Sequence, residues 1–182
     1  MLAKLIDWCL RISHEQIMPA KNYASDIYGL KNYDGRTYQK PYNIMNQEKA
    51  YTDWVYACVS AIAKDVAIND FWVTKKETNR FDHPLSVLLK NPNERDTEYN
   101  MSFGISTYLD LTGNAFIYLA PNRMGLPTEM WLIPPSTVQV IPSTKNFIKG
   151  YEINMNGKLF QLSPAEILHM KTFNPNNLFY GQ

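Results

Sequence analysis

Apolar side chains recur at helical spacing most clearly between residues 52 and 67. Residues three to four positions apart share a helix face, and one stripe here carries Val55, Cys58 or Val59, Ile62 and Val66. Thr52 occupies the N-cap position, where threonine is favoured. We expect this stripe to be the buried face of the helix.

A second helix is predicted between Thr97 and Thr112, with Asp96 or Thr97 as its cap. Its shared apolar face carries Met101, Ile105, Tyr108 and Thr112. Gly104 lies inside this helix, where glycine costs about 1 kcal/mol relative to alanine. Its presence therefore predicts that another part of the chain packs closely against the helix there.

Short strands are predicted through the rest of the chain. Gly113 and Asn114 end the second helix, since glycine tolerates the left-handed C-cap conformation, and the apolar run 115–120 follows as a buried strand. Asn156 and Gly157 lie between two five-residue runs, which is the strongest short signal for a β-hairpin. Further strands are predicted within 71–81, 129–135, 137–142 and 169–173.

Two short helices are also predicted. One begins at Pro84 and is stopped by the Asn-Pro-Asn run around Pro92, with His83 as a local turn or cap residue. The other begins at Ser163, where a proline at the first helical position and Glu166 at the third complete a capping box. This second helix would run for one or two turns before the strand that starts at His169.

These elements predict an α+β fold in which helices flank short, mostly antiparallel strands. We divide the chain into an amphipathic N-terminal helix at 1–20, a Tyr-rich arm or linker at 21–50, and one α+β domain at 51–182. The candidate interaction arm carries Tyr23, Tyr28, Tyr33, Tyr38 and Tyr42. It would lie on a neighbouring subunit, act as a flexible linker, or stack on single-stranded nucleic acid with its lysines and arginines.

Composition narrows the class of protein. The chain is 45% hydrophobic and 19% charged, which is typical of a globular domain. Its net charge of +1 gives no overall attraction to nucleic acid or to an anionic membrane, and no apolar run approaches the ~20 residues that span a bilayer. Cys9 and Cys58 lie far apart in no metal or redox spacing, so we expect free thiols.

The sequence offers little catalytic chemistry. His14, His83 and His169 have no partner at metal-binding spacing, and a lone histidine such as His169 is more often a structural hydrogen-bonding group than a base. There is no glycine-rich phosphate loop and no Gly-x-Ser-x-Gly motif. The remaining candidate ligands fit solvated helix ends better than a metal site: Asp65, Asp70, Glu94, Asp96 and Glu98. We therefore expect no enzyme, no cofactor and no metal.

Five blocks follow one another along the chain. They are VYACVSAIAKDVA, HPLSVLLKNPN, LTGNAFIYL, MWLIPPSTVQVI, and YEI followed by LSPAEILHMKTF and Gly181. In this order they resemble the portal proteins of tailed bacteriophages of the siphophage type, over about residues 51–181. The resemblance implies structural roles for the motif residues His83, Pro84, Pro92, Gly113, Asn114, Asn156, Gly157, Ser163, Glu166 and His169.

The resemblance also implies a portal wing-like fold without channel helices and clip, so the chain would be a truncated portal or a natural or cloned fragment of one. Family members form a dodecameric ring at one capsid vertex, through which double-stranded DNA is packaged and ejected. Capsid or scaffold protein, terminase and a head–tail adaptor would be the partners, without a membrane. The protein would be made in the host cytoplasm and would work in the virion. Two other functions stay open: a nucleic-acid-binding module built on the 21–50 arm, and a small hydrolase that uses His169.

Overall fold

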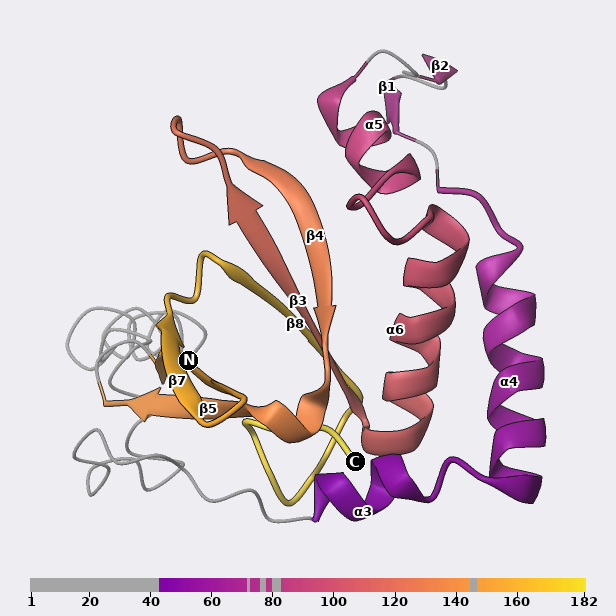
Figure 1. Cartoon of the computed structure of the whole chain (residues 1–182), viewed down its shortest axis with the longest axis vertical. Helices are drawn as coiled ribbons and strands as arrows, with labels where there is room; N and C mark the ends of the chain where they lie inside the picture. The colour runs from indigo at the N-terminus through magenta and orange to yellow at the C-terminus, as the bar shows by residue number, and fades with distance from the viewer. Residues whose placement is uncertain (1–42, 72, 76–77, 80–82, 145–146) are drawn as a thin grey trace, which may run out of the picture.

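Two antiparallel three-stranded sheets pack against each other, and helices cover the outer face of one of them (Figure 1). The computed structural model describes residues 43–71, 73–75, 78–79, 83–144 and 147–182. The predicted α+β class is confirmed. The helix predicted within 1–20 and the tyrosines of the arm lie outside the described residues, so both remain predictions.

The helices lie on one side of the described structure. They are α3 (Ile44–Lys49), α4 (Asp53–Ala67), α5 (Pro84–Lys90) and α6 (Glu98–Thr112). α4 packs along α6, and α6 packs against the nearer sheet (Figure 1). A pair of two-residue strands, β1 (Thr74–Lys75) and β2 (Thr78–Asn79), lies between α4 and α5 in the chain.

The sheet beside α6 has the order β4-β3-β8 and is called the central sheet below. Its middle strand β3 (Asn114–Pro121) pairs with β4 (Pro127–Ile133) and β8 (Ile167–Lys171). The second sheet has the order β5-β6-β7, with β5 (Val138–Ser143), β6 (Phe147–Met155) and β7 (Lys158–Leu162). The short 3-10 helix η2 (Pro135–Thr137) connects β4 to β5 and so joins the two sheets.

Both faces of the central sheet are buried, which explains the unbroken apolar run in β3. Successive side chains of a strand point to opposite faces. Ile117 therefore packs with Met101 of α6 in a helix-side core, whereas Phe116 packs with Tyr151 of the second sheet in an inter-sheet core. A strand covered on both sides needs apolar residues at every position, not at every second one.

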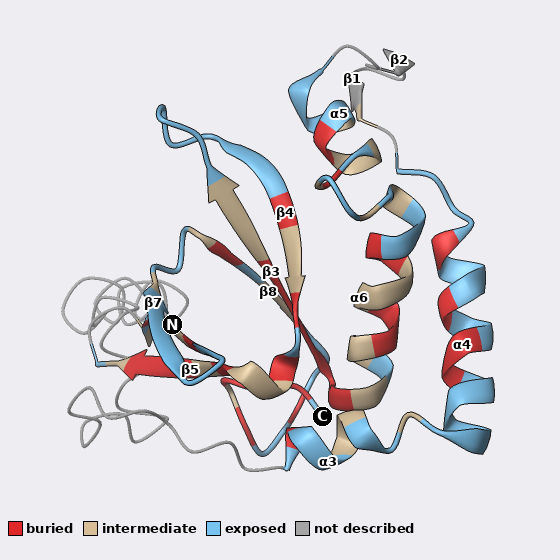
Figure 2. Cartoon of the chain, viewed as in Figure 1, coloured by how far each residue is buried: buried red, intermediate tan, exposed pale blue. Residues whose placement is uncertain are grey.

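The helix predicted at 52–67 is confirmed as α4, but the prediction of its buried face is wrong. Thr52 is the N-cap residue, although its side chain makes no capping hydrogen bond. The buried residues are instead Val59, Ser60, Ala63 and Ala67, and these face α6 (Figure 2). Small side chains thus form the contact between the two helices. Of the predicted stripe, Val59, the alternative to Cys58, is buried, whereas Val55, Cys58, Ile62 and Val66 lie about a quarter of a turn away and are exposed.

The prediction for residues 163–166 is also wrong, in an informative way. Only half of the capping box forms: Glu166 Oε2 accepts from the Ser163 amide at 2.9 Å and from the Ser163 hydroxyl at 2.8 Å, whereas the Glu166 amide donates to the Ser163 carbonyl at 3.1 Å instead of to the hydroxyl. These hydrogen bonds close a turn, and no helix follows. Ile167 already pairs with Tyr118 of β3, so sheet pairing begins before a second helical turn can form. His169 consequently lies in the middle of β8, not at its start.

Other local predictions are confirmed. α6 has Thr97 as its N-cap and ends at Gly113 with φ +67, and a Cβ on Gly104 would lie only 2.5 Å from Leu132 Cδ2. Asn156 and Gly157 both have positive φ at the β6–β7 turn, as a two-residue hairpin of this kind requires.

The motif around α5 is confirmed as well. His83 is the N-cap of the helix, and its Nδ1 accepts a hydrogen bond from the Leu85 amide at 3.2 Å. Pro84 is the first helical residue, and the helix ends at Lys90, just before Pro92. By contrast, α3 was missed: this part of the presumed linker is helical, and its Ile44 is only 3% exposed, in the inter-sheet core.

Buried and exposed apolar residues should differ in how much stability is lost when the side chain is removed. We expect Phe116→Ala to lower the free energy of unfolding by about 3–5 kcal/mol, because the residue is fully buried. Ile62→Ala should change it by no more than about 0.5 kcal/mol, because that side chain is 52% exposed. Urea denaturation of both variants measures the difference. Equal losses would mean that the α4 stripe is buried in the subunit after all.

Candidate functional site

Residues 172–182 form a segment that leaves β8 and returns to the end of α6; we call it the C-terminal strap. Phe179 and Tyr180 of the strap enter the inter-sheet core, where they are 4% and 1% exposed. The Tyr180 hydroxyl accepts a hydrogen bond from the Val140 amide of β5 at 2.8 Å. Phe147 of β6 stacks on Phe179 with ring centroids 4.9 Å apart. The strap therefore holds the second sheet in place.

Two buried asparagines give the strap its shape. Asn177 Oδ1 accepts hydrogen bonds from the amides of Phe179 and Tyr180 at 2.8 and 3.0 Å. Asn174 Oδ1 accepts from the Asn176 amide at 2.9 Å, and Asn174 Nδ2 donates to the Gly181 carbonyl at 3.3 Å. Such asparagine turns satisfy backbone groups that have no helix or strand partner. The Pro/Asn-rich sequence thus encodes a folded segment.

Asn114, His169 and Gly181 meet at the base of β3 and form what we call the polar node. Asn114 is fully buried. Its Oδ1 accepts from the Gly181 amide at 2.7 Å, and its Nδ2 donates to the Thr112 carbonyl. These two partners fix the orientation of the Asn114 amide, because a backbone N–H can only donate and a carbonyl can only accept. His169 Nε2, 3.2 Å from the same Oδ1, must therefore carry a hydrogen.

Close backbone approach requires glycine on both sides of the node. A Cβ on Gly181 would lie 1.9 Å from the Gly113 carbonyl oxygen and 2.8 Å from Thr172 Oγ1. A Cβ on Gly113 would lie 2.4 Å from the Gln182 amide nitrogen, and Gly113 also has a positive φ. The Thr172 amide donates to the Gly113 carbonyl at 2.9 Å. The end of α6, β8 and the strap are thus joined at one point.

His169 is held neutral by its surroundings. Its ring stacks on Phe116 with centroids 4.1 Å apart and meets Tyr151 edge-on at 5.9 Å. Burial lowers the pKa of His169 from its ordinary value of 6.5 to about 3, and the positive charge of Lys171 contributes further. A base with so low a pKa accepts protons poorly near neutral pH. The node is therefore suited to holding the fold together, not to catalysis.

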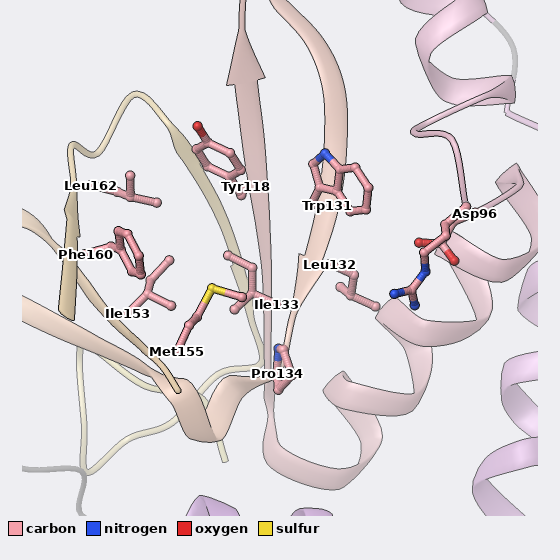
Figure 3. A pocket seen from close by; sticks show the side chains of 11 residues that line it. Asp96, Tyr118, Trp131, Leu132, Ile133, Pro134, Ile153, Met155, Phe160 and Leu162 are labelled. Atoms are coloured by element: carbon pink, nitrogen blue, oxygen red, sulfur yellow. The ribbon is translucent and has the colours of Figure 1, made fainter. Parts of the chain in front are cut away.

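A groove opens between the two sheets and is called the inter-sheet groove below (Figure 3). Its cavity of about 580 Å³ is lined mainly by apolar residues: Tyr118, Trp131, Leu132, Ile133, Pro134, Ile153, Met155, Phe160 and Leu162. Arg95 and Asp96 supply the charged part of the lining. The Trp131 Nε1 hydrogen is donated to Glu129 Oε2 at 2.9 Å, so the ring has its polar group satisfied and offers apolar surface.

The lining of this groove contains no histidine, cysteine or serine. It has the shape and chemistry to bind an apolar surface. In the described part of the chain, no cluster of histidine, cysteine and acidic residues could hold a metal ion. The helices of that same part are also too short or too polar to cross a membrane.

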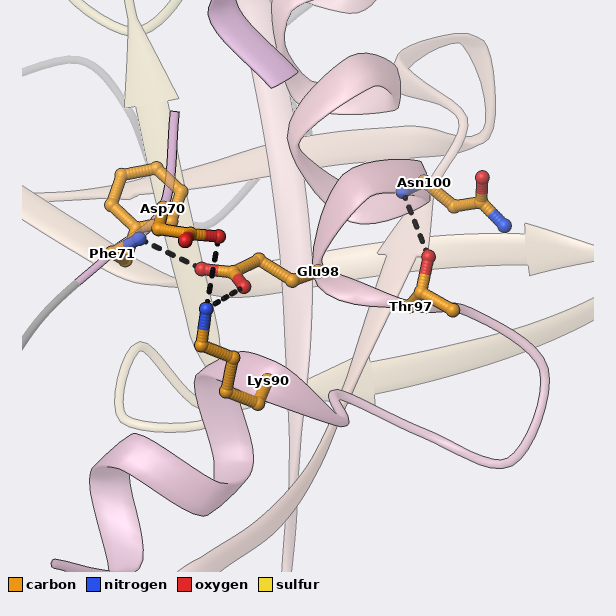
Figure 4. A network of polar contacts seen from close by, with 6 residues as sticks. All are labelled: Asp70, Phe71, Lys90, Thr97, Glu98 and Asn100. Atoms are coloured by element: carbon orange, nitrogen blue, oxygen red, sulfur yellow. Dashed lines mark hydrogen bonds and ion pairs between the residues drawn. The ribbon is translucent and has the colours of Figure 1, made fainter. Parts of the chain in front are cut away.

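A charged network ties three helix ends together (Figure 4). Lys90 Nζ lies 2.6 Å from Glu98 Oε2 and 3.0 Å from Asp70 Oδ1, and Glu98 Oε1 accepts from the Phe71 amide at 2.8 Å. The hydrogen bond to Glu98, followed by that to Asp70, raises the pKa of Lys90. Lys90 ends α5 and Glu98 begins α6, so each charge also suits its helix dipole. The network is structural.

A family model for the phage portal protein matches residues 53–182, which is most of the chain. The chain belongs to the phage portal protein family. Portal proteins are a structural family without enzymatic activity, which excludes the small hydrolase considered above. A relative in Rickettsia bellii (strain RML369-C), an uncharacterized protein, is 27% identical over 134 residues.

Solved portal-type structures share the fold. A chain in the neck of an empty GTA particle, computed with C6 symmetry, superposes with a TM-score of 0.76 at 22% identity over 85% of this chain. One in the neck of a native GTA particle, computed with C12 symmetry, gives 0.72 at 20% identity over 87%. An HK97 family phage portal protein from Corynebacterium diphtheriae gives 0.51 at 16% identity over 74%.

This portal-family chain corresponds to only part of these proteins. It spans 34% of the Rickettsia relative, 44% and 43% of the two GTA neck chains, and 43% of the HK97 family portal.

The structure brings together some of the predicted motif residues and separates others. Gly113, Asn114 and His169 meet at the polar node, as architectural residues. The remaining motif residues act locally at α5, at the β6–β7 hairpin and at the turn before β8: His83, Pro84, Pro92, Asn156, Gly157, Ser163 and Glu166. Sequence reasoning missed Thr172, Asn174 and Asn177, whose only signal was the clustering of asparagine and proline.

Removing the Asn114 amide should destabilise the subunit. Asn114→Ala leaves the Gly181 amide and His169 Nε2 without their acceptor, and a buried donor without a partner costs about 1–3 kcal/mol. Asn176→Ala, an exposed change in the same strap, should cost no more than about 0.5 kcal/mol. Urea denaturation compares the two. An Asn114→Ala variant as stable as the native chain would show that the strap is not held at the node.

The node should also make stability depend on pH. His169 is neutral in the fold, so the unfolded chain binds a proton below pH 6.5 that the folded chain does not bind until about pH 3. The free energy of unfolding should therefore fall as pH falls through this window, by up to about 1.4 kcal/mol per pH unit from this group.

His169→Gln removes the titrating group and keeps a side-chain N–H for Asn114 Oδ1. The difference in unfolding free energy between the native chain and this variant, measured from pH 7 to pH 4, isolates the contribution of His169. The native chain should lose more stability on acidification. If the unfolding free energies of the two chains fall in parallel with pH, His169 is as easily protonated in the folded chain as in the unfolded chain.

Proposed function

We propose that this chain forms the outer, wing part of a ring-shaped portal at the DNA-conducting vertex of a phage or gene-transfer-agent particle, and that it works through contacts between copies of itself. The observation that supports this most directly is the portal-family match over residues 53–182. The shared fold with chains in particle necks, one computed with C12 symmetry, adds the expectation of a ring.

The physical role of such a ring is to hold an opening of fixed shape for double-stranded DNA. The described domain suits it, because the node and the strap lock both sheets and the helices into one body. The net charge of +1 suits it as well, since each neutralised phosphate would add salt-dependent affinity and slow the passage of DNA. Capsid or scaffold protein, terminase and a head–tail adaptor are the partners that we propose for the ring.

The native mass of the full 182-residue chain tests the proposal. We expect light scattering and native mass spectrometry to detect a discrete species of about 250 kDa, the mass of twelve 21.1-kDa chains, whose share grows with protein concentration. Contacts between apolar surfaces should keep this species intact at high salt, where exposed ion pairs are screened. A monomer at every concentration would contradict assembly through this part of the portal.

A further inference from the structure

α4 carries two apolar faces, and among the described residues only one of them is covered. The face made of Val59, Ser60, Ala63 and Ala67 packs on α6. The other face is the α4 outer stripe, defined as Val55, Cys58, Ile62 and Val66, and it points away from α6. Val55, Ile62 and Val66 are 40%, 52% and 43% exposed, and Cys58 is an exposed free thiol.

Single exposed apolar residues are common, but a row of them along one helix is not accidental. Four such residues on successive turns make a continuous strip about 16 Å long, at 1.5 Å per residue. Trp54 and Ile68, 85% and 71% exposed, extend the apolar surface near the two ends of α4. Contiguous surface of this kind marks a site of protein contact. A specific interface buries about 800 Å² on each partner, and this helix face can supply its centre.

The inter-sheet groove is the second apolar surface, and its lining includes no residue of α4. The helices cover one face of the central sheet, whereas most of the groove lies between the two sheets and also reaches round β4 to Leu132 and Asp96 beside α6 (Figure 3). Met155 and Phe160 at the groove are 55% and 48% exposed. A cavity of about 580 Å³ with such walls accepts several side chains of an apolar helix face.

The symmetry of a ring requires two different contact surfaces on each subunit. In a cyclic assembly with more than two members, one surface of each copy binds a different surface of the next copy. The outer stripe and the groove meet this requirement, since one is a helix face and the other is a hollow lined mainly by strand residues. One charged pair can also form: exposed Asp65 lies beside the stripe on α4, and Arg95 lies next to Asp96 in the groove lining.

We infer that in the assembled ring the α4 outer stripe of one copy docks into the inter-sheet groove of the next copy. This inference rests on the proposed ring function and names the surfaces that build it. The apolar stripe would displace water from the groove, and Arg95 would face Asp65 of the adjacent copy at the edge of the contact. The same contact repeated from copy to copy closes the ring.

Oxidative cross-linking tests the pairing in the full chain. Cys9→Ser leaves Cys58 as the only native thiol, and Met155→Cys then adds a thiol at the groove. With copper phenanthroline as oxidant, a denaturing gel should show a ladder of covalent dimers, trimers and higher multiples, because each copy links to two neighbours. Met124→Cys in the same Cys9→Ser background is the matched control. Met124 is 84% exposed at the β3–β4 turn, so random collisions would cross-link it at least as well.

A pair of helix variants tests the contact from the other side. Ile62→Asp places a carboxylate in the stripe and should abolish both the ladder and the ring-sized species. Ala61→Asp places the same group one residue away, about 100° around the helix, at another exposed position, and should leave both intact. At a protein concentration where the native chain is monomeric, both variants should unfold at nearly the same urea concentration as it does, since neither residue is buried in the subunit.

The outcomes separate the inference from the proposed function. A ring-sized species without a ladder from the Met155→Cys chain would overturn the stripe–groove pairing and leave the ring standing. A dimer band from the Cys9→Ser chain alone would mean that two α4 helices pair with each other, which also overturns it. Cross-linking from position 155 to Cys9 in a Cys58→Ser chain would make the N-terminal segment the occupant of the groove. If neither a ring-sized species nor a cross-linked ladder forms, both proposals are overturned.

Discussion

The hydrogen bonds of the Asn114 side chain are the interaction on which the rest of the fold depends. One fully buried amide joins the last turn of α6, the strand β8 and the strap, whose Gly181 lies 67 positions from Asn114 in the sequence. Each of these partners is a donor or an acceptor that would otherwise be buried without a partner. Because an unpaired buried group is costly, the orientation of the Asn114 amide, the tautomer of His169 and the path of the strap are fixed together.

The local elements could be predicted from the sequence, because the signals for them are local. The left-handed Gly113, the Asn156–Gly157 turn and the Thr97 cap depend on one residue and its immediate neighbours. The capping box at Ser163 shows the limit of this reasoning. The hydrogen bond from the Ser163 amide to the Glu166 carboxylate forms, yet strand pairing from Ile167 onward decides the secondary structure.

The buried face of α4 could not be predicted, and the reason is physical. Helical periodicity reports which side chains are apolar and not which partner covers them. Here α6 is covered by Val59 and the small residues Ser60, Ala63 and Ala67, while most of the larger apolar residues of α4 stay outside. The polar node was equally hidden, since no spacing rule links Asn114 to Gly181. For a subunit of an assembly, a surface that looks like core in the sequence can be the face that meets the next copy.

The position of the strap has a consequence for the order in which the molecule is made. Phe179 and Tyr180 complete a core whose other members begin at Ile44, so the ribosome must synthesise nearly the whole domain before that core can close. α4 and α6 can form their contact much earlier, because they are near neighbours in the sequence. Until synthesis passes Gly181, the second sheet lacks its anchor, and the groove between the sheets lacks a fixed wall. The anchor of the second sheet, which forms one wall of the groove, is therefore the last part of the described chain to be made.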